Sequence, residues 1–449
     1  MIIVIYSDTN ASSIVSNLGL PEYSYYFVLK EFRPVLEQLG IVVTVMNPAL
    51  EVDTIYRNAK AHGESCVFLS FSPPHKTEVD LECPTIPVFA WEFSTLPTES
   101  WLGEPRHDWR YVFDRLGSTI THSEFTSDVV RQTMTPAFPV ASIPAPVWDR
   151  FSALREKSSI ANFPDGIELN VEGTVIDSRS VDLSPYGASQ RGEPKPVLVR
   201  PPALARREPA KVHIDGVVYT SVFNPLDGRK NWYDMISAFC WAFRDIEDAT
   251  LVLKLTHNDP QVGIDNLLEN VYKLTPFKCR ILLIHGYLSD ADYESLVSVT
   301  TYVLNTSHGE GQCLPLMEFM SCGKPAVAPR NTAMADYIDS YNAFVLDSSA
   351  EPSNWPHDPR RAYRTLRYRI DWTTLLDAYK ESYRVAKHDP ARYQKMAEHA
   401  VRKLQLHCSR AVVKERLETF FSNHPGIVAN CVGHNATQMF EAEKRIRAC

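Results

Sequence analysis

The segment TYVLNTSHGEGQCLPLMEFMSCGKPAVA, residues 301–328, contains a strand, a loop, a helix and a second strand in that order. The apolar run at its start predicts a buried strand, and HGEGQC predicts a loop. LPLMEFMSC predicts a short helix, because Pro315 lies in its first turn and Gly323 lies just past its end. GKPAVA leads into the next strand. Doubly wound α/β domains are built from such units, in which a helix begins at the carboxyl end of a strand.

The same α/β pattern occupies most of the chain. Residues 1–149 contain the apolar runs MIIVIYS, IVVTVM, CVFLSF, IPVFAWEF and STITHSEF, which are typical of strands buried on both faces of a parallel sheet. YFVLKEFRPVLEQLG is apolar at helical spacing and ends at Gly40, which predicts a crossover helix. A second pattern of this kind occupies residues 211–400. We predict two facing, doubly wound, Rossmann-like α/β domains with a ligand-binding cleft between them.

Two further segments interrupt or follow these domains. Residues 152–210 alternate in hydrophobicity around Glu172 and Gly173 and then become rich in Pro, Arg and Ser. This pattern predicts an inserted β-hairpin followed by an extended linker near the interdomain hinge. For residues 401–449 we predict C-terminal helices that pack back on the N-terminal domain.

Composition excludes several classes of protein. The chain has 449 residues, of which 44% are hydrophobic, and a net charge of −8, which argues against general nucleic-acid binding. Its nine cysteines are scattered without a C-x-x-C pair, which favours reduced thiols over a disulfide or zinc framework. No signal-peptide pattern and no apolar run of about 18 residues is present. We therefore expect a cytoplasmic protein, with peripheral contact to the inner face of the cell membrane and the oligomeric state left open.

Two glutamates flank the start of the helix in the opening segment. Seven residues separate Glu310, in the loop, from Glu318, in the helix. The free N–H groups and dipole of a helix N-terminus favour phosphate, and a carboxylate accepts two O–H groups from a vicinal diol. This arrangement suits a sugar nucleotide, which has a diphosphate between two hydroxyl-bearing rings. From spacing alone, a helix-capping glutamate beside a solvated one fits as well.

A pair of cations lies at another turn between a strand and a helix. Arg229 and Lys230, in NPLDGRKNW, are expected at the same end of the C-terminal sheet as the two glutamates. Adjacent cations opposite a helix N-terminus would neutralise a departing diphosphate. The alternative for either residue is a solvated loop cation.

The order FNPLDGRKN, LVLKLT, IHGYLSDADYESL and LNTSHGEGQCLPLMEFMSCGKPAVA resembles the C-terminal domain of retaining glycosyltransferases of family four, which have the GT-B fold. The resemblance covers roughly residues 217–346 and includes the E-x7-E spacing. It implies that Glu318 holds the ribose of the donor and Glu310 contacts the transferred sugar, while Arg229 and Lys230 bind the diphosphate. It also implies a donor site lined by Gly311, Gln312, Cys313 and Leu314, with Tyr287 and Leu288 near the base.

The chain departs from the family pattern at two places. Cys313 stands where a glycine is common, and WEFSTLP has Trp91 and Glu92 where many relatives have a histidine and an acid. Glu92 is our candidate for orienting the acceptor hydroxyl, and a structural acid at a strand end is the alternative. Gly19 resembles the glycine loop that approaches the donor phosphate, or is a plain turn glycine. Lys254 would neutralise phosphate, or extend from its strand end into solvent.

Other polar groups are assigned structural roles. The DAD sequence at Asp290–Asp292 imitates a metal-binding motif, but it begins a predicted helix, where acids cap and complement the dipole. For His75 and His122, at strand ends, we favour structural roles over acceptor contact. Two basic tracts are expected to be solvated, or to face an anionic lipid carrier: Arg200, Arg206 and Arg207, and Arg360, Arg361, Arg364, Arg367 and Arg369.

The resemblance implies a retaining transferase that moves a hexose-type sugar from a nucleotide-diphosphate sugar to an acceptor hydroxyl. No metal and no cofactor is expected. The acceptor would be a saccharide or lipid-linked saccharide, in the synthesis of surface polysaccharide or lipid-linked glycan. Two alternatives remain open at this point. One is a nucleotide-sugar epimerase or hydrolase on the same fold, and the other is a catalytically silent subunit that binds sugar nucleotides.

Overall fold

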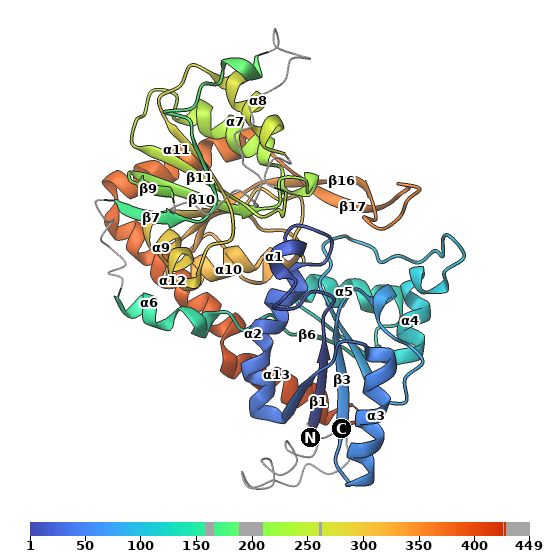
Figure 1. The fold of residues 1–449 in the computed structure, drawn as a ribbon. Helices are drawn as coiled ribbons and strands as arrows, with labels where there is room; N and C mark the ends of the chain where they lie inside the picture. Colours follow the sequence, from blue (N-terminus) through green and yellow to red (C-terminus); the bar gives the residue numbers. More distant parts are fainter. Residues whose placement is uncertain (158–165, 188–209, 260–262, 425, 428–449) are drawn as a thin grey trace.

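A computed structural model describes residues 1–157, 166–187, 210–259, 263–424 and 426–427. The chain forms two α/β domains that face each other (Figure 1). The N-terminal domain, blue to cyan in the figure, lies below the C-terminal domain, which is green to orange. The predicted pair of facing domains is confirmed.

The N-terminal domain is built on a sheet of parallel strands in the order β2-β1-β3-β4-β5-β6. The strands are β1 (Ile2–Tyr6), β2 (Ile41–Thr44), β3 (Cys66–Phe71), β4 (Thr85–Phe89), β5 (Thr119–Thr121) and β6 (Val140–Ser142). The helices of this domain are α1 (Ile14–Asn17), α2 (Ser24–Leu39), α3 (Pro48–Ala61), α4 (Trp109–Leu116) and α5 (Glu124–Thr133).

Helix α2 is the predicted crossover helix. It buries Val28, Phe32 and Val35 on one face, at the spacing that lets a helix cover a sheet. It ends at Leu39 because Gly40 leaves room for the Met1 carbonyl oxygen, which would lie 2.2 Å from a Cβ at that position.

The C-terminal domain is built on a sheet with the order β15-β14-β13-β10-β11-β12-β8. Its strands are β8 (Thr174–Asp177), β10 (Val217–Phe223), β11 (Ala249–Leu255), β12 (Arg280–His285), β13 (Tyr302–Leu304), β14 (Ala326–Pro329) and β15 (Ala343–Leu346). Its helices include α7 (Trp232–Ala242), α8 (Ile264–Leu274), α9 (Asp290–Val299), α10 (Leu314–Ser321) and α11 (Trp372–His388). The strand, helix and strand predicted for residues 301–328 are β13, α10 and β14.

The inserted β-hairpin predicted around Glu172 and Gly173 is wrong. The first strand, β7 (Ile167–Val171), pairs with β9 (Ala210–Ile214), whereas β8 pairs antiparallel with β12 at the edge of the C-terminal sheet. The edge of β12 offers unpaired backbone groups along a buried strand, and pairing with them outweighs a local turn. The predicted Pro- and Arg-rich linker falls mainly on residues 188–209, outside the described residues.

A hairpin of β16 (Ser348–Asn354) and β17 (Tyr363–Ile370) joins the domains, and we call it the cross-domain hairpin. It extends from the C-terminal domain over loops of the N-terminal domain (Figure 1). Thr95 Oγ1 donates to the carbonyl of Arg364 at 2.8 Å, and Glu99 pairs with both Arg360 and Arg364. Part of the basic tract expected to be solvated is thus used in contact between domains.

The last helices return to the N-terminal domain. The boundary predicted between residues 400 and 401 is misplaced, because it falls inside α12 (Pro390–Cys408). The next helix, α13 (Arg410–Ser422), contacts α2. Arg416 Nη1 donates to the Ser142 carbonyl of β6 at 3.1 Å. The short 3-10 helix η3 (Trp148–Phe151) lies where the chain first leaves the N-terminal domain.

Candidate functional site

A cleft of about 840 Å³ lies between the two domains, at the carboxyl ends of their strands. The N-terminal domain contributes the segments that follow β1, β3 and β4, and the C-terminal domain contributes those that follow β10 to β13. Every site residue named from the sequence lines this cleft: Gly19, Glu92, Arg229, Lys230, Lys254, Tyr287, Leu288, Glu310, Gly311, Gln312, Cys313, Leu314 and Glu318. The fold brings them together, while their individual roles stay predictions.

Glu310 lies at the centre of a hydrogen-bonded cluster just after β13. Its Oε1 accepts hydrogen bonds from Lys230 Nζ (2.6 Å), Ser307 Oγ (2.5 Å) and Asn305 Nδ2 (3.1 Å). Its Oε2 lies 3.4 Å from Arg229 Nη1. Because the residue is only 4% exposed, these partners fix the carboxylate in one orientation.

Arg229 is shared among several carboxylates. Its Nε lies 3.0 Å from Glu92, and its Nη2 donates to Asp227 at 2.8 Å. Asp227 also accepts a hydrogen bond from the backbone N–H of Arg229. This bond caps the 3-10 turn Gly228–Lys230, which holds Arg229 and Lys230 at the end of β10. Both predicted cations therefore lie in the cleft, and both are paired there with carboxylates rather than solvated.

The pKa values of the acidic and basic groups in this cluster are shifted in different directions. Burial would raise the pKa of Glu310, but Lys230 and Arg229 outweigh it and hold the pKa at about 2. Burial raises the pKa of Glu92 in spite of the attraction of Arg229. Burial lowers the pKa of Lys230, yet Glu310 reverses this and the pKa is raised. Glu310 thus stays anionic and Lys230 cationic at neutral pH, and Glu92 is the better proton acceptor of the two glutamates.

Glu318 belongs to a second cluster. Tyr293 donates to its Oε2 at 2.5 Å, and Arg150 Nη1, from η3, lies 3.3 Å from its Oε1. Arg150 also lies 3.3 Å from Glu31 of α2 and 2.9 Å from Asp290 of α9. The Arg150 guanidinium therefore links the N-terminal domain to α9 and α10, two helices of the C-terminal domain that border the cleft.

The ionisation of Glu31 makes stability depend on pH. Burial raises its pKa to about 7, against the attraction of Arg150. The pKa of a glutamate in the unfolded chain is about 4.3, so between about pH 4.3 and about pH 7 the folded protein binds more protons at Glu31 than the unfolded protein does. The free energy of unfolding therefore falls as the pH rises from about 4.5 to about 7. We expect Glu31→Gln to remove this fall and to be more stable than wild type at pH 8, by up to about 3 kcal/mol.

Thermal unfolding of wild type and Glu31→Gln between pH 4.5 and pH 8 measures this effect. Glu37→Gln is the control, because Glu37 lies on the same helix but is exposed and paired with Arg33. Parallel curves for wild type and Glu31→Gln would contradict the assignment.

The loop before α10 contacts the N-terminal domain. Cys313 has a backbone φ of +64°, in the left-handed region that glycine adopts at little cost, which agrees with the glycine common there in the resembled family. Gln312 Oε1 accepts from the backbone N–H of Ala145 at 2.9 Å, and Gln312 Nε2 is buried without a hydrogen-bond partner in the described part of the chain. A Cβ on Gly311 would lie 2.7 Å from that of Ala90. These contacts fix the start of α10 against the N-terminal domain.

Gly19 lies where the N-terminal domain meets the C-terminal domain. Its φ is +82°, and a Cβ there would lie 2.6 Å from the Thr256 carbonyl oxygen and 2.7 Å from His257 Cα. Asn224 Nδ2 donates to the Gly19 carbonyl at 2.7 Å. Position 19 therefore requires glycine for two reasons, the positive φ of its turn and the close approach of the C-terminal domain.

We expect Gly19→Ala to lower the melting temperature more than Gly63→Ala. Both positions have positive φ, so a left-handed alanine costs about 1 kcal/mol in each variant. Only at Gly19 would the new methyl group meet backbone atoms, whereas nothing lies within 4 Å of it at Gly63. The clash adds about 1–3 kcal/mol. Equal losses in thermal unfolding would show that the interdomain contact at Gly19 is unimportant.

Lys254 is a buried cation at the end of β11. It is 5% exposed, so the alternative in which it extends into solvent is wrong. Its Nζ donates to the Leu255 carbonyl at 2.9 Å, and no ion pair with another described residue neutralises it. Burial lowers its pKa to about 8. A buried ammonium in this position is suited to an anionic ligand.

The remaining predicted residues have distinct environments. Tyr287 and Leu288 follow β12, and Tyr287 is partly exposed at the cleft. His122 is buried, its Nδ1 lies 2.9 Å from the Ile143 carbonyl, and burial lowers its pKa to about 4. It also lines the cleft, and its Nε2 has no hydrogen-bond partner among the described residues, so its structural role stays a prediction. At the DAD sequence, Ser289 rather than an aspartate caps α9, and Asp290 pairs with Arg150.

Sequence reasoning missed four residues that contact the two glutamates. Asn305 and Ser307 follow β13, so their position at a strand end was a usable signal. Tyr293 and Arg150 carry no such signal, because their helix and linker positions are ordinary in sequence.

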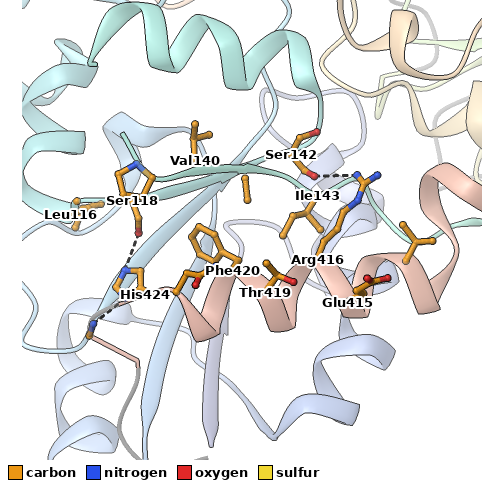
Figure 2. Close-up of a pocket in the computed structure, with 16 residues that line it drawn as sticks. Leu116, Ser118, Val140, Ser142, Ile143, Glu415, Arg416, Thr419, Phe420 and His424 are labelled. Carbon is orange, nitrogen blue, oxygen red and sulfur yellow. Dashed lines mark hydrogen bonds between the residues drawn. The ribbon is translucent and has the colours of Figure 1, made fainter. Parts of the chain in front are cut away.

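A second cavity of about 740 Å³ lies between β6 and α13 (Figure 2). Figure 2 shows Arg416 directed at Ser142 and His424 directed at Ser118, with hydrogen bonds of 3.1 and 2.9 Å. None of the candidate residues lines this cavity. The interdomain cleft is therefore the candidate active site.

Comparison with solved structures establishes the fold. The sucrose-phosphate synthase of Thermosynechococcus elongatus matches with a TM-score of 0.52 and 12% identity over 98% of this chain and 100% of that one. HepE of Anabaena, solved with UDP and glucose, matches with a TM-score of 0.51 and 12% identity over 94% and 100% of the two chains. The fold is GT-B. This chain also spans 55% of S. aureus TarM, at a TM-score of 0.47 and 10% identity over 80% of this chain.

Sequence comparisons add nothing to this assignment, since no protein-family model and no curated protein matches the chain. Within the described residues, no helix combines the length and the apolar character needed to cross a membrane.

Proposed function

We propose that this chain is a retaining glycosyltransferase that moves a hexose-type sugar from a nucleotide-diphosphate sugar to an acceptor hydroxyl. The observation that carries the proposal is Glu310, oriented by Lys230 and Arg229 beside the start of α10 in the cleft of a GT-B fold. One fold neighbour, HepE of Anabaena, has been solved in complex with UDP-glucose.

The donor would extend across both clusters. Glu310 would accept hydrogen bonds from the transferred sugar, and Glu318, held by Tyr293, would accept them from the ribose. The diphosphate would lie between them at the start of α10, where backbone N–H groups favour anions. Buried Lys254 adds positive charge to the same cleft. The segment at Tyr287 and Leu288 would contact the base.

The reaction we propose is displacement on one face of the sugar. The bond between the anomeric carbon and the diphosphate oxygen breaks, and its electron pair leaves with the diphosphate. The acceptor hydroxyl bonds to the anomeric carbon from the same side and gives its proton to the departing phosphate oxygen. Arg229 and Lys230 would stabilise the negative charge that develops there, without a metal ion.

The pairing of Arg229 has a consequence for this step. Its guanidinium lies 3.0 Å from Glu92 and 3.4 Å from Glu310, so a diphosphate must compete with these carboxylates for it. When Arg229 turns to phosphate, Glu92 loses its cation and becomes free to orient the acceptor hydroxyl. The acceptor we propose is a saccharide or lipid-linked saccharide, in surface polysaccharide or lipid-linked glycan synthesis.

A turnover assay tests the proposal against its alternatives. The protein is incubated with candidate nucleotide sugars with and without saccharide acceptors, and the anomeric configuration of the product is read by NMR. Acceptor-dependent turnover with retention supports the transferase. Donor consumption at full rate without acceptor supports an epimerase or hydrolase, and donor binding without turnover supports a silent subunit.

A further inference from the structure

A third polar cluster, separate from those around Glu310 and Glu318, lies at the rim of the cleft. Glu22, His75 and His357 each place one potential ligand atom within 4.8 Å of the other two. Glu22 precedes α2, and His75 lies in the 3-10 turn after β3, so both belong to the N-terminal domain. His357 lies in the turn of the cross-domain hairpin, which comes from the C-terminal domain. None of the three is assigned to the donor site.

The two histidine rings contact each other, and His75 has an unpaired ring nitrogen. The His75 ring lies 4.8 Å from the His357 ring and stacks on Trp109 at 6.0 Å. His75 Nδ1 is buried and has no hydrogen-bond partner among the described residues. Such an unpaired nitrogen is costly unless a ligand satisfies it.

Glu22 supplies negative charge to this cluster. Its side chain is 9% exposed, and it forms an ion pair with Lys76, which also lies 3.2 Å from Asp8. Its backbone φ is +68°, in the left-handed region that residues other than glycine rarely adopt. Strained backbone of this kind is often retained at a functional position.

We propose that Glu22, His75 and His357 bind one zinc ion that joins the two domains. Two imidazoles and a carboxylate are ligands that zinc accepts, with bonds of about 2.0–2.2 Å. A tetrahedral site then needs ligand atoms about 3.4 Å apart. The three candidate ligand atoms all lie within 4.8 Å of one another, so no pair has to move closer by more than about 1.4 Å to reach this spacing. His107, whose ring lies 6.0 Å from that of His75, or a water molecule would complete the coordination.

The ion would act as a structural link. It would hold the cross-domain hairpin on the N-terminal domain and so fix the rim of the cleft. Lys76 competes with it, because its ammonium already occupies the Glu22 carboxylate. The site does not depend on the proposed transfer reaction, since its ligands are distinct from Arg229, Lys230 and Glu310.

Zinc titration tests the proposal. Protein treated with a chelator is titrated with zinc chloride by calorimetry, and with cobalt chloride by absorbance, and its melting temperature is recorded with and without zinc. We expect wild type to bind one more ion than His357→Ala and to gain several degrees in melting temperature. Glu22→Gln keeps the shape of the side chain but removes a direct ligand, so it should weaken zinc binding by more than the roughly 10–100-fold that loss of an outer-shell partner costs. Lys76→Met should bind it more tightly than wild type.

The controls separate this site from other metal ligands in the chain. His62→Ala removes an exposed histidine outside the cluster and should behave as wild type. Circular dichroism without zinc shows whether each variant is folded. If wild type, His357→Ala and Glu22→Gln bind zinc with the same stoichiometry and the same thermal response, or if Lys76→Met binds it more weakly than wild type, the proposal is wrong.

Discussion

Replacing Lys230 by alanine is expected to lower kcat by about 100-fold or more while the protein stays folded. Lys230 Nζ lies 2.6 Å from Glu310, so it both positions that carboxylate and supplies positive charge to the cleft. Preorganised charge of this kind acts on the transition state, where the diphosphate oxygen becomes more negative. The variant should therefore lose turnover more than ground-state binding of the donor.

The loss of Lys230 also changes Glu310 itself. Lys230 is the stronger of the two cations that hold the pKa of Glu310 at about 2, so the pKa should rise in Lys230→Ala. Lys230→Arg keeps the charge and should recover part of the activity. Lys278→Ala, which removes an exposed lysine of a surface ion pair, is the control and should match wild type. Full activity in a folded Lys230→Ala protein would remove this residue from the mechanism.

The second large effect is expected at Glu318. Glu318→Ala should weaken nucleotide binding by about 100-fold, because two hydrogen bonds from a ribose diol to a carboxylate are together worth about 3 kcal/mol. Arg150 keeps Glu31 and Asp290 as partners in this variant, so the linker around it should stay in place. Tyr293→Phe leaves the carboxylate but removes its positioning hydrogen bond, and should cost less.

Calorimetric titration of each variant with the nucleotide that binds wild type measures these differences in affinity. Glu294→Ala is the matched control, since Glu294 is an exposed glutamate on α9, the helix that also carries Tyr293. A Glu318→Ala protein that binds the nucleotide as tightly as wild type would exclude the ribose role.

The fold was accessible from sequence where local and tertiary signals agree. The strand, loop and helix at residues 301–328 follow from an apolar run, a glycine-containing loop and a helix with Pro315 in its first turn, and the structure has all three. The turn at Glu172 and Gly173 predicted a hairpin of β7 and β8, which is wrong because β8 pairs with β12 instead. A carbonyl oxygen of His285 lies where a side chain on Gly173 would be, a constraint visible only in three dimensions.

The candidate site was predictable to a similar extent. Residues at strand ends could be placed in the cleft, because parallel strands end on one edge of a sheet. Arg150 could not, since its partners Glu31 and Glu318 lie 119 and 168 positions away and its own segment has no distinctive pattern. The pairing of Arg229 with Glu92 is likewise a contact between domains, which no local spacing specifies.

The central claim is that this cleft binds a nucleotide-diphosphate sugar, and calorimetric titration of the wild-type protein tests it most directly. UDP, GDP, dTDP and CDP and their sugars are titrated one by one, with thermal unfolding as a second readout. We expect one nucleotide to bind with a stoichiometry of one and to raise the melting temperature. If none of them binds, the GT-B fold of this chain serves another ligand and the proposed function is contradicted.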